Sequence, residues 1–146
     1  MLSLLEGADD PHLREALAWG RAHLPAPEVA ARTLHGDLLP QNILLPLEGD
    51  APALLDWECA VVGDPAHDLA VVTRGVRHPL KVEGGLERLV EVYLEAGGAE
   101  WVTPDAVRVH ELAMVGSWHR GALEGEPGLH PGTTLPRLRA LLSRLA

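Results

Sequence analysis

Three polar side chains flank short apolar runs in a pattern that suits phosphoryl transfer. Asp37 and Asn42 are separated by a Pro-containing loop, and Asp56 follows a second apolar run, Leu54-Leu55. A phosphoryl-transfer site needs a carboxylate that accepts a hydroxyl proton, an oxygen ligand for Mg²⁺, and a second carboxylate that holds the metal against the phosphates. Asp37, Asn42 and Asp56 offer these groups in that order. Either Asp37 or Asn42 alone is better explained as a turn cap, so the interpretation rests on the spacing of all three.

The segment between Asn42 and Asp56 predicts a β-hairpin. Ile43-Leu44-Leu45 and Ala53-Leu54-Leu55 are apolar runs separated by the turn sequence Glu48-Gly49-Asp50, a typical hairpin pattern. Residues that flank the same end of two antiparallel strands are neighbours. The hairpin therefore predicts that Asn42, at its entry, lies close to Asp56, at its exit.

The rest of the chain predicts helices. Asp10-Pro11 and Asp64-Pro65 each combine an N-cap residue with a proline at the first helical position. We expect the helices that follow to end at Pro25-Ala26-Pro27 and at Gly75. Residues 28–33 read as irregular or as a brief helical turn. The other expected segments are a helix over 86–94 closed by Gly97-Gly98, a helix from Thr103-Pro104 to about Leu123, a loop over 124–134, and a final helix carrying Leu135 to Leu145.

Composition indicates a mainly α protein with a small β-hairpin. Of the 146 residues 47% are hydrophobic, with no Phe and one Tyr, which favours helices over an all-β core. No apolar run approaches the ~20 residues that cross a bilayer, and the N-terminus lacks the basic region of a signal peptide. Cys59 has no partner for an internal disulfide, and its apolar neighbours predict that it is buried. We therefore expect a cytoplasmic protein.

The charge balance restricts the partners. The formal net charge is -9, from 21 acidic residues against 12 Lys and Arg. An acidic protein repels phosphate backbones, so we expect no nucleic-acid partner. The same field slightly favours a cationic small molecule over a neutral one.

Three motifs together resemble those of the aminoglycoside phosphotransferase and choline kinase family, small-molecule kinases with the protein-kinase-like fold. The motifs are His-Gly-Asp-Leu-x-Pro-x-Asn-Ile-Leu from His35, Leu-Leu-Asp-Trp-Glu from Leu54, and Gly-Asp-Pro-Ala-His-Asp-Leu-Ala from Gly63. The resemblance is dense from about Leu34 to Ala70. Elsewhere it rests on the helical pattern only.

The resemblance implies a role for each polar residue of the motifs. Asp37 would be the catalytic base, with Asn42 and Asp56 as Mg²⁺ ligands and ATP as co-substrate. Asp68 would hydrogen-bond the catalytic loop and fix its shape, and His35 would brace the same loop. From the residues alone, Asp68 is as well explained as a solvated carboxylate that the helix dipole favours in a first turn.

The first 34 residues depart from the family pattern. The family has an N-terminal β-rich lobe with a phosphate-covering loop, a lysine for the α- and β-phosphates with its paired Glu, and a hinge that grips adenine. Here a helix and a linker precede His35, and the one lysine, Lys81, follows the site. We therefore expect a single domain over 1–146, the C-terminal helical lobe of a protein-kinase-like fold without the N-terminal β-rich lobe. Its parts would be a helix and linker over 1–34, catalytic and metal loops with the hairpin over 35–64, and a helical remainder over 65–146.

Three functions fit this pattern. The first is Mg²⁺-assisted, ATP-dependent phosphoryl transfer to a small-molecule hydroxyl, incomplete or weak in this chain alone. The second is a non-catalytic binding or interaction module that keeps the loop for its fold. The third is one half of a two-chain kinase whose other lobe comes from a separate chain or a partner copy. An uncovered apolar face would also predict a homo-oligomer.

Overall fold

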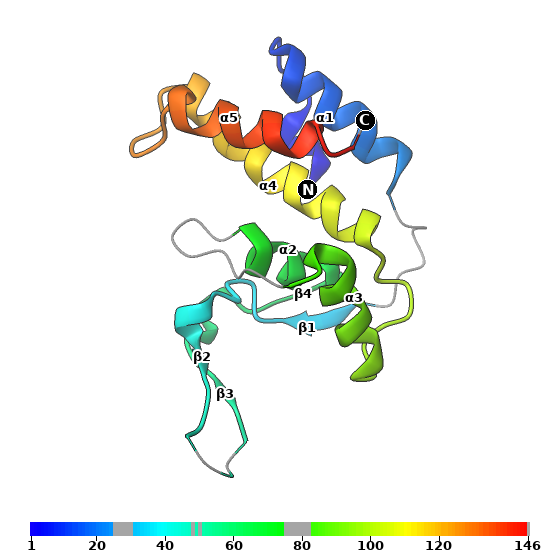
Figure 1. The fold of residues 1–146 in the computed structure, drawn as a ribbon. Coiled ribbons are helices and arrows are strands. Elements are labelled where there is room, and N and C mark those ends of the chain that lie inside the picture. Colours follow the sequence, from blue (N-terminus) through cyan, green and yellow to red (C-terminus); the bar gives the residue numbers. More distant parts are fainter. Residues whose placement is uncertain (25–30, 48, 50, 75–82, 146) are drawn as a thin grey trace. The chain divides into compact units, whose positions relative to one another are not determined.

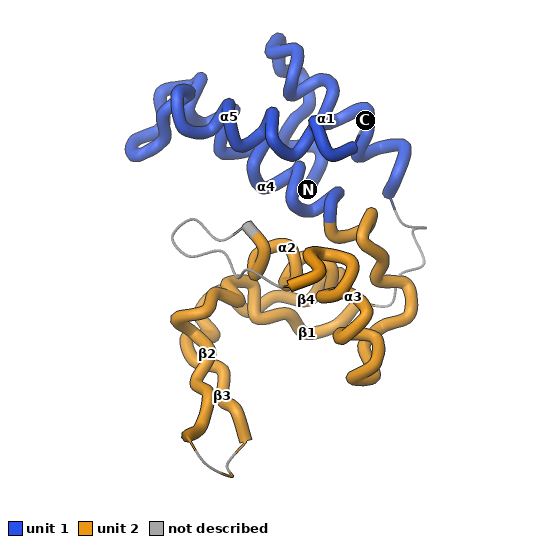
Figure 2. The backbone as a smooth tube through the Cα atoms, viewed as in Figure 1, with its two compact units in different colours: residues 1–24, 108–146 blue, residues 25–107 orange. Residues whose placement is uncertain are grey.

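The computed structural model describes residues 1–24, 31–47, 49, 51–74 and 83–145 (Figure 1). These residues form two compact units (Figure 2), one from residues 1–24 and 108–146 and the other from residues 25–107. Several sequence expectations lie outside the described residues: the helix terminators Pro25–Pro27 and Gly75, the turn residues Glu48 and Asp50, and Lys81. The expectation of a single domain over 1–146 stays a prediction, and each unit is described by itself.

The first unit is helical. It consists of a 3₁₀ helix, Leu2–Leu5, with α1 (Pro11–Ala22), α5 (Pro131–Leu142) and the larger part of α4 (Pro104–Leu123). The apolar stripe of α1 enters the core, because Leu13 and Ala16 are completely buried. The buried cluster contains Leu2, Leu5, Leu13, Ala16, Val109, Leu112, Ala113, Val115, Leu138, Leu141 and Leu142.

The start of α1 has the cap that the sequence predicts. The side chain of Asp10 accepts hydrogen bonds from the backbone N–H groups of His12 (2.9 Å) and Leu13 (3.1 Å). Pro11 occupies the first helical position, where no hydrogen-bond donor is needed. The cap satisfies two of the N–H groups that a helix start leaves without a partner inside the helix.

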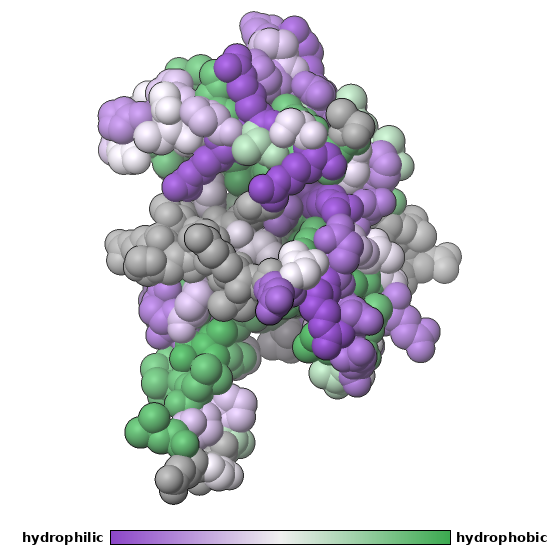
Figure 3. All heavy atoms as spheres, viewed as in Figure 1, coloured by the Kyte–Doolittle hydropathy of each residue, from purple (hydrophilic) through white to green (hydrophobic). Residues whose placement is uncertain are grey.

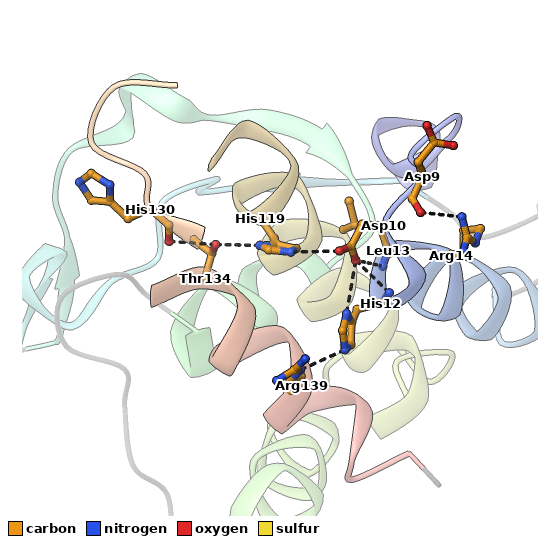
Figure 4. Close-up of polar contacts among 9 residues, drawn as sticks. All are labelled: Asp9, Asp10, His12, Leu13, Arg14, His119, His130, Thr134 and Arg139. Atoms are coloured by element: carbon orange, nitrogen blue, oxygen red, sulfur yellow. Dashed lines mark hydrogen bonds and ion pairs between the residues drawn. The ribbon is translucent and has the colours of Figure 1, made fainter. Parts of the chain in front are cut away.

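A polar network around Asp10 links the three helices of this unit (Figure 4). His119, on α4, is 1% exposed; its Nδ1 lies 2.9 Å from the hydroxyl of Thr134 on α5, and its Nε2 lies 3.7 Å from Asp10 Oδ2. On the other side of the carboxylate, His12 Nδ1 lies 3.5 Å from Asp10 Oδ1. Arg139 donates to Nε2 of the same histidine at 3.0 Å. One carboxylate therefore faces two imidazole rings from two helices.

The second unit contains two short antiparallel strand pairs. β2 (Ile43–Leu44) pairs with β3 (Ala53–Leu54), so that Ile43 is opposite Leu54. β1 (Arg32–Leu34) pairs with β4 (Val61–Gly63), with Leu34 opposite Val61. The second pairing joins the segment before His35 to the segment after Asp56, and both candidate loops start or end at these strands.

Helices α2 (Ala66–Arg74) and α3 (Gly85–Glu95) and the first turn of α4 complete the second unit. Asp64 caps α2 by accepting a hydrogen bond from the backbone N–H of Ala66 at 3.0 Å. After α3 the chain turns back, and the hydroxyl of Tyr93 accepts a hydrogen bond from the Ala99 N–H at 3.1 Å. The buried cluster of this unit contains Ala66, Leu69, Ala70, Val90, Val102, Ala106 and Val107.

The mainly α architecture with a small hairpin confirms the expected fold class, and two local expectations of these elements are wrong. Arg32 and Thr33 lie in a strand and not in an irregular or helical segment, because β4 supplies their backbone partners. The strand over 61–63 was itself unexpected. Helix α5 begins at Pro131, within the predicted loop, since a proline is well suited to a first helical position.

The described residues contain no helix that is both long and apolar enough to pass through a membrane.

Candidate active site

Asp37 and Asn42 lie side by side in the loop after β1. The side-chain nitrogen of Asn42 donates to the backbone carbonyl of Asp37 at 2.9 Å and to its carboxylate Oδ2 at 3.2 Å. Pro40 opens a 3₁₀ turn, Pro40–Asn42, that brings the amide back toward Asp37. Asn42 is only 7% exposed. Because both contacts to Asp37 use the amide nitrogen, the amide oxygen can serve as a ligand atom.

Asp68 holds the backbone of the same loop from the first turn of α2. Its two carboxylate oxygens accept hydrogen bonds from the backbone N–H groups of His35 (2.7 Å) and Gly36 (2.9 Å). Hydrogen bonds to a charged acceptor are worth about 1.5–3 kcal/mol each when buried. The residues alone also allowed Asp68 to be a solvated carboxylate in the first turn of a helix. The structure shows instead that Asp68 binds the backbone of the two residues that precede Asp37.

His35 joins the Asp37 loop to the Asp56 segment. The ring is 2% exposed, and its Nε2 lies 2.7 Å from the backbone carbonyl of Leu55. A carbonyl only accepts hydrogen bonds, so Nε2 carries the proton and Nδ1 is free to accept from the backbone N–H of Asp37 at 3.3 Å. The ring also lies against Trp57, with ring centroids 4.8 Å apart. One imidazole thus contacts the residues on both sides of Asp56.

Gly36 lets the two segments approach closely. Its φ angle is +79°, and a Cβ at this position would overlap the backbone carbonyl of Cys59. Cys59 closes the short 3₁₀ helix Trp57–Cys59 that follows Asp56. It is exposed, so the expectation of a buried thiol is wrong: Gly36 packs against the Cys59 backbone, and the segment lies at the surface.

Asp56 has a left-handed backbone conformation, with φ 63° and ψ 62°. Among the described residues it is the one non-glycine residue with a positive φ. Such a conformation costs an aspartate about 1 kcal/mol and is found where the surrounding structure enforces it, often at functional sites. Here the neighbours enforce it, since the Leu55 N–H donates to the Asn42 carbonyl at 2.8 Å and the Leu55 carbonyl contacts His35. The predicted proximity of Asn42 and the Asp56 segment is confirmed.

The donor set has the chemistry of a magnesium site. One carboxylate and one amide oxygen from loops are ligands that Mg²⁺ prefers, because it binds hard oxygen atoms and keeps several waters. The described residues hold no group of three or more His, Cys, Asp and Glu side chains arranged for a metal ion. The Asn42 amide and the Asp56 carboxylate supply oxygen atoms, the donor type that Mg²⁺ takes.

A cavity of about 490 Å³ lies in the second unit beside this loop. Asp68 and Leu38 contribute to its wall together with Tyr93 and Trp101, and the guanidinium of Arg32 lies 5.2 Å from the Trp101 ring centroid. Asp37, Asn42 and Asp56 are not among the lining residues. The cavity is therefore separate from the candidate site, although Asp68 borders both.

The comparison with known families decides the classification. Residues 2–112 match the model of the phosphotransferase enzyme family, which is more than half of the chain. The chain belongs to the phosphotransferase enzyme family. The resemblance read from the three motifs is thereby confirmed, and the match extends it across α1 and into α4.

Individual relatives match shorter stretches of the chain. Uncharacterized protein YcbJ of Bacillus subtilis (strain 168) is 40% identical over 68 residues, which are 47% of this chain and 21% of YcbJ. Acyl-CoA dehydrogenase family member 11 of Gallus gallus is 36% identical over 67 residues, 45% of this chain and 9% of that protein. The protein of that name in Homo sapiens is 25% identical over 111 residues, 66% of this chain and 14% of its own. The chain thus spans about a fifth or less of these relatives, and no solved structure matches it.

The structure adds contacts that the sequence pattern did not predict. The motifs named the polar side chains of the candidate site, but not the backbone carbonyls of Leu55 and Cys59 or the strand β4 that places them. The run Ala60-Val61-Val62 before Gly63 is rich in β-branched residues and was a usable strand signal. A contact to a backbone carbonyl does not depend on the type of the residue that carries it. The contact between His35 and the Leu55 carbonyl therefore could not be predicted from the sequence.

Proposed function

We propose that this chain carries the catalytic loop of a small-molecule kinase, which transfers the γ-phosphoryl group of ATP to a hydroxyl. The observation that supports this most is the contact between Asp37 and Asn42, at 3.2 Å, on a loop whose backbone is tied to Asp68. Phosphoryl transfer depends on positioning and charge neutralisation more than on covalent chemistry. A loop held at both ends by hydrogen bonds meets the first of these needs.

Asp37 is the proposed catalytic base. Its carboxylate would accept the proton of the acceptor hydroxyl as that oxygen attacks the γ-phosphorus, while the bond to the ADP oxygen breaks. The amide of Asn42 fixes one carboxylate oxygen, Oδ2, and so orients the other toward the acceptor. His35 and Asp68 are positioning residues, because they contact the loop backbone and the Leu55 carbonyl.

Asn42 and Asp56 are the proposed metal-binding residues. They would hold Mg²⁺, which would supply positive charge that offsets the charge of the phosphates. The free amide oxygen of Asn42 and the carboxylate of Asp56 sit on adjoining segments, linked by the Leu55-to-Asn42 backbone bond. The left-handed backbone of Asp56 sets the direction of its carboxylate, which supports a ligand role over a turn cap.

For the acceptor we propose a small molecule with a hydroxyl group, with a slight preference for a cationic one. The formal charge of -9 supports this preference, since a negative field raises the local concentration of cations.

We also propose that the 146 residues alone turn over ATP slowly. The segment before His35 holds α1 and β1 with no Gly-rich phosphate loop, and the chain's single lysine is Lys81, so ATP lacks a phosphate clamp here.

The metal site can be tested without relying on activity. Mn²⁺, a paramagnetic substitute for Mg²⁺, should broaden the NMR resonances of residues 37–42 and 55–57 in the wild-type chain. Asp56→Asn should weaken Mn²⁺ binding at least tenfold, because it removes the charged ligand. Glu58→Gln is the matched control: it removes an exposed carboxylate two residues away and should bind Mn²⁺ as the wild type does. Equal binding by wild type and Asp56→Asn would overturn the proposed metal site.

Measurements of ATP turnover then distinguish a weakly active kinase, a non-catalytic interaction module and one half of a two-chain kinase. We expect Mg²⁺-dependent ATP consumption near the detection limit, abolished by Asp37→Ala, and rapid turnover would contradict the proposed weak activity. Metal binding without any turnover, even with a second chain that supplies a phosphate-clamping lobe, would favour the non-catalytic interaction module. That second candidate is supported by the exposed apolar hairpin. Recovery of turnover with such a chain would favour the two-chain kinase.

A further inference from the structure

The cavity of about 490 Å³ in the second unit is lined by β1, the start of α2, the end of α3 and the turn over 97–101. These elements lie next to one another in Figure 1. The volume is in the range of small-molecule sites, about 300–1,000 Å³. Because Asp37, Asn42 and Asp56 are not part of the wall, the cavity can hold a ligand of its own.

Much of the wall of this cavity is apolar. Leu34 and Leu69 line it and are 4% and 8% exposed. The half-buried rings of Tyr93 and Trp101 form another part of the wall. In Figure 3 the outer surface over α3 is largely hydrophilic (purple), so the apolar lining does not continue as a surface patch over this helix. A ligand with an apolar body would bury that body against these side chains.

Two exposed side chains of opposite charge belong to the same wall, Arg32 and Glu100. Within the described part of the chain neither forms an ion pair, and the side chain of Arg32 makes one long hydrogen bond, 3.4 Å, to the carbonyl of Ala31. The guanidinium lies over the ring of Trp101, 5.2 Å from its centroid. Such stacking holds the planar group in place and leaves its N–H groups available for a carboxylate.

The hydroxyl group of Tyr93 adds a hydrogen-bond donor to the wall. It accepts from the Ala99 N–H at 3.1 Å, and its own hydrogen has no acceptor among the described residues. The carboxylate of Asp68 also lines the cavity, but its two oxygens already accept backbone N–H groups of the loop. The wall therefore offers donors for an anionic group and, at Glu100, a carboxylate for a cationic group.

We infer that this cavity binds a free α-amino acid with an apolar side chain. The carboxylate of the ligand binds Arg32, its ammonium group pairs with Glu100, and its side chain packs against the apolar wall. A simple carboxylate would meet the charge of Glu100 without a group to match it, and a simple amine would meet that of Arg32 in the same way. A zwitterion matches both charges. It has no net charge, so the formal charge of -9 neither attracts nor repels it.

This binding site does not rest on the proposed function. No proposed base or metal ligand lines the cavity, so the amino acid is not the phosphoryl acceptor. Asp56→Asn should therefore lose Mn²⁺ and still bind the amino acid. A wild-type chain that binds the amino acid but no Mn²⁺ would contradict only the function, and one that binds Mn²⁺ but no amino acid would contradict only this inference.

Four matched ligands test the inference by NMR titration of the wild-type chain at 0.15 M NaCl. L-phenylalanine has all three groups, 3-phenylpropionate lacks the ammonium group, 2-phenylethylamine lacks the carboxylate, and glycine lacks the apolar side chain. Phenylalanine should shift the amide resonances of residues 32–34 and 97–101, and each of the other three should bind at least about fivefold more weakly. No shift of these resonances at 20 mM phenylalanine would overturn the inference. So would an equal affinity for phenylalanine and any of the other three ligands.

Two substitutions assign the charged contacts. Arg32→Gln should weaken the binding of phenylalanine and 3-phenylpropionate but not of 2-phenylethylamine. Glu100→Gln should weaken the binding of phenylalanine and 2-phenylethylamine but not of 3-phenylpropionate. The control Arg137→Gln removes an exposed guanidinium on α5, in the first unit, and should bind all four ligands as the wild type does. An unchanged affinity for phenylalanine in either Arg32→Gln or Glu100→Gln would overturn the inference, because the zwitterion would then bind elsewhere.

Discussion

At the scale of single residues, the site depends on contacts to backbone atoms. One ring nitrogen of His35 donates a hydrogen bond to the Leu55 carbonyl, and the other accepts one from the Asp37 N–H. Asp68 accepts both N–H groups that precede Asp37. None of these contacts touches a reacting atom. They fix the distance between the segment that carries Asp37 and the segment that carries Asp56, which is what a two-loop phosphoryl-transfer site requires.

Gly36 permits this approach and gives the sharpest residue-scale prediction. Gly36→Ala should lower the free energy of unfolding by at least about 3 kcal/mol, because the new methyl group meets the Cys59 carbonyl in addition to the cost of a positive φ. Urea denaturation followed by tryptophan fluorescence measures the loss, since Trp57 lies beside the site.

Gly97→Ala separates the two costs. Gly97 is in the same unit and has a φ of +85°, but a Cβ there meets nothing within 4 Å. It should therefore lose only about 1–2 kcal/mol, the backbone cost alone. Equal losses for the two variants would mean that the contact between Gly36 and Cys59 does not constrain the loop.

At the scale of elements, Asp10 connects the start of α1 to α4 and α5. Burial raises the pKa of Asp10, but the hydrogen bonds from the Leu13 and His12 N–H groups, with the nearby His119, outweigh it, so the pKa lies below its ordinary 3.8. A carboxyl group whose pKa is lowered by folding stabilises the folded state when it is ionised. That contribution is present above pH 4 and is lost as the pH falls through the lowered pKa.

The acid side of the stability curve should therefore depend on Asp10. On acidification from pH 5 to pH 2.5, the wild type should lose more stability than Asp10→Asn, because asparagine caps a helix as well as aspartate but does not titrate. Amide exchange of α1 across this pH range, compared at each pH, measures the difference. The exposed neighbour gives the control, and Asp9→Asn should follow the wild type. Parallel curves for wild type and Asp10→Asn would contradict the role of the charge.

The elements also show how far sequence reasoning reaches. Helix starts were predictable, because an N-cap aspartate followed by a proline, as in Asp10-Pro11 and Asp64-Pro65, favours a helix start without any distant contact. The hairpin was predictable from two short apolar runs and a Gly-containing turn. Strand β1 was not, since it is three residues long and its backbone partners come from β4, whose β-branched run was a usable but unused signal. The side chains of the candidate site followed from motif spacing, whereas the backbone carbonyls that hold them depend on β4.

At the scale of the whole molecule, the excess of acidic residues acts on any ligand. A formal charge of -9 on 146 residues produces a negative field, and such a field concentrates cations near the surface. The field depends on the charge of a ligand and not on its shape, so it attracts all cationic acceptors to a similar extent. Its range is set by screening, about 10 Å at 0.1 M salt and 3 Å at 1 M.

Matched acceptors can isolate this effect. Choline and its neutral isostere 3,3-dimethylbutan-1-ol have the same hydroxyl and nearly the same shape. In the presence of Mg²⁺ and at 20 mM salt, choline should bind the chain about two- to fivefold more tightly, as judged by NMR titration. At 0.5 M salt the two affinities should converge. Equal affinities at low salt would contradict the field effect. A preference for choline that persists at high salt would instead indicate a short-range contact, with a carboxylate or an aromatic face beside the bound cation.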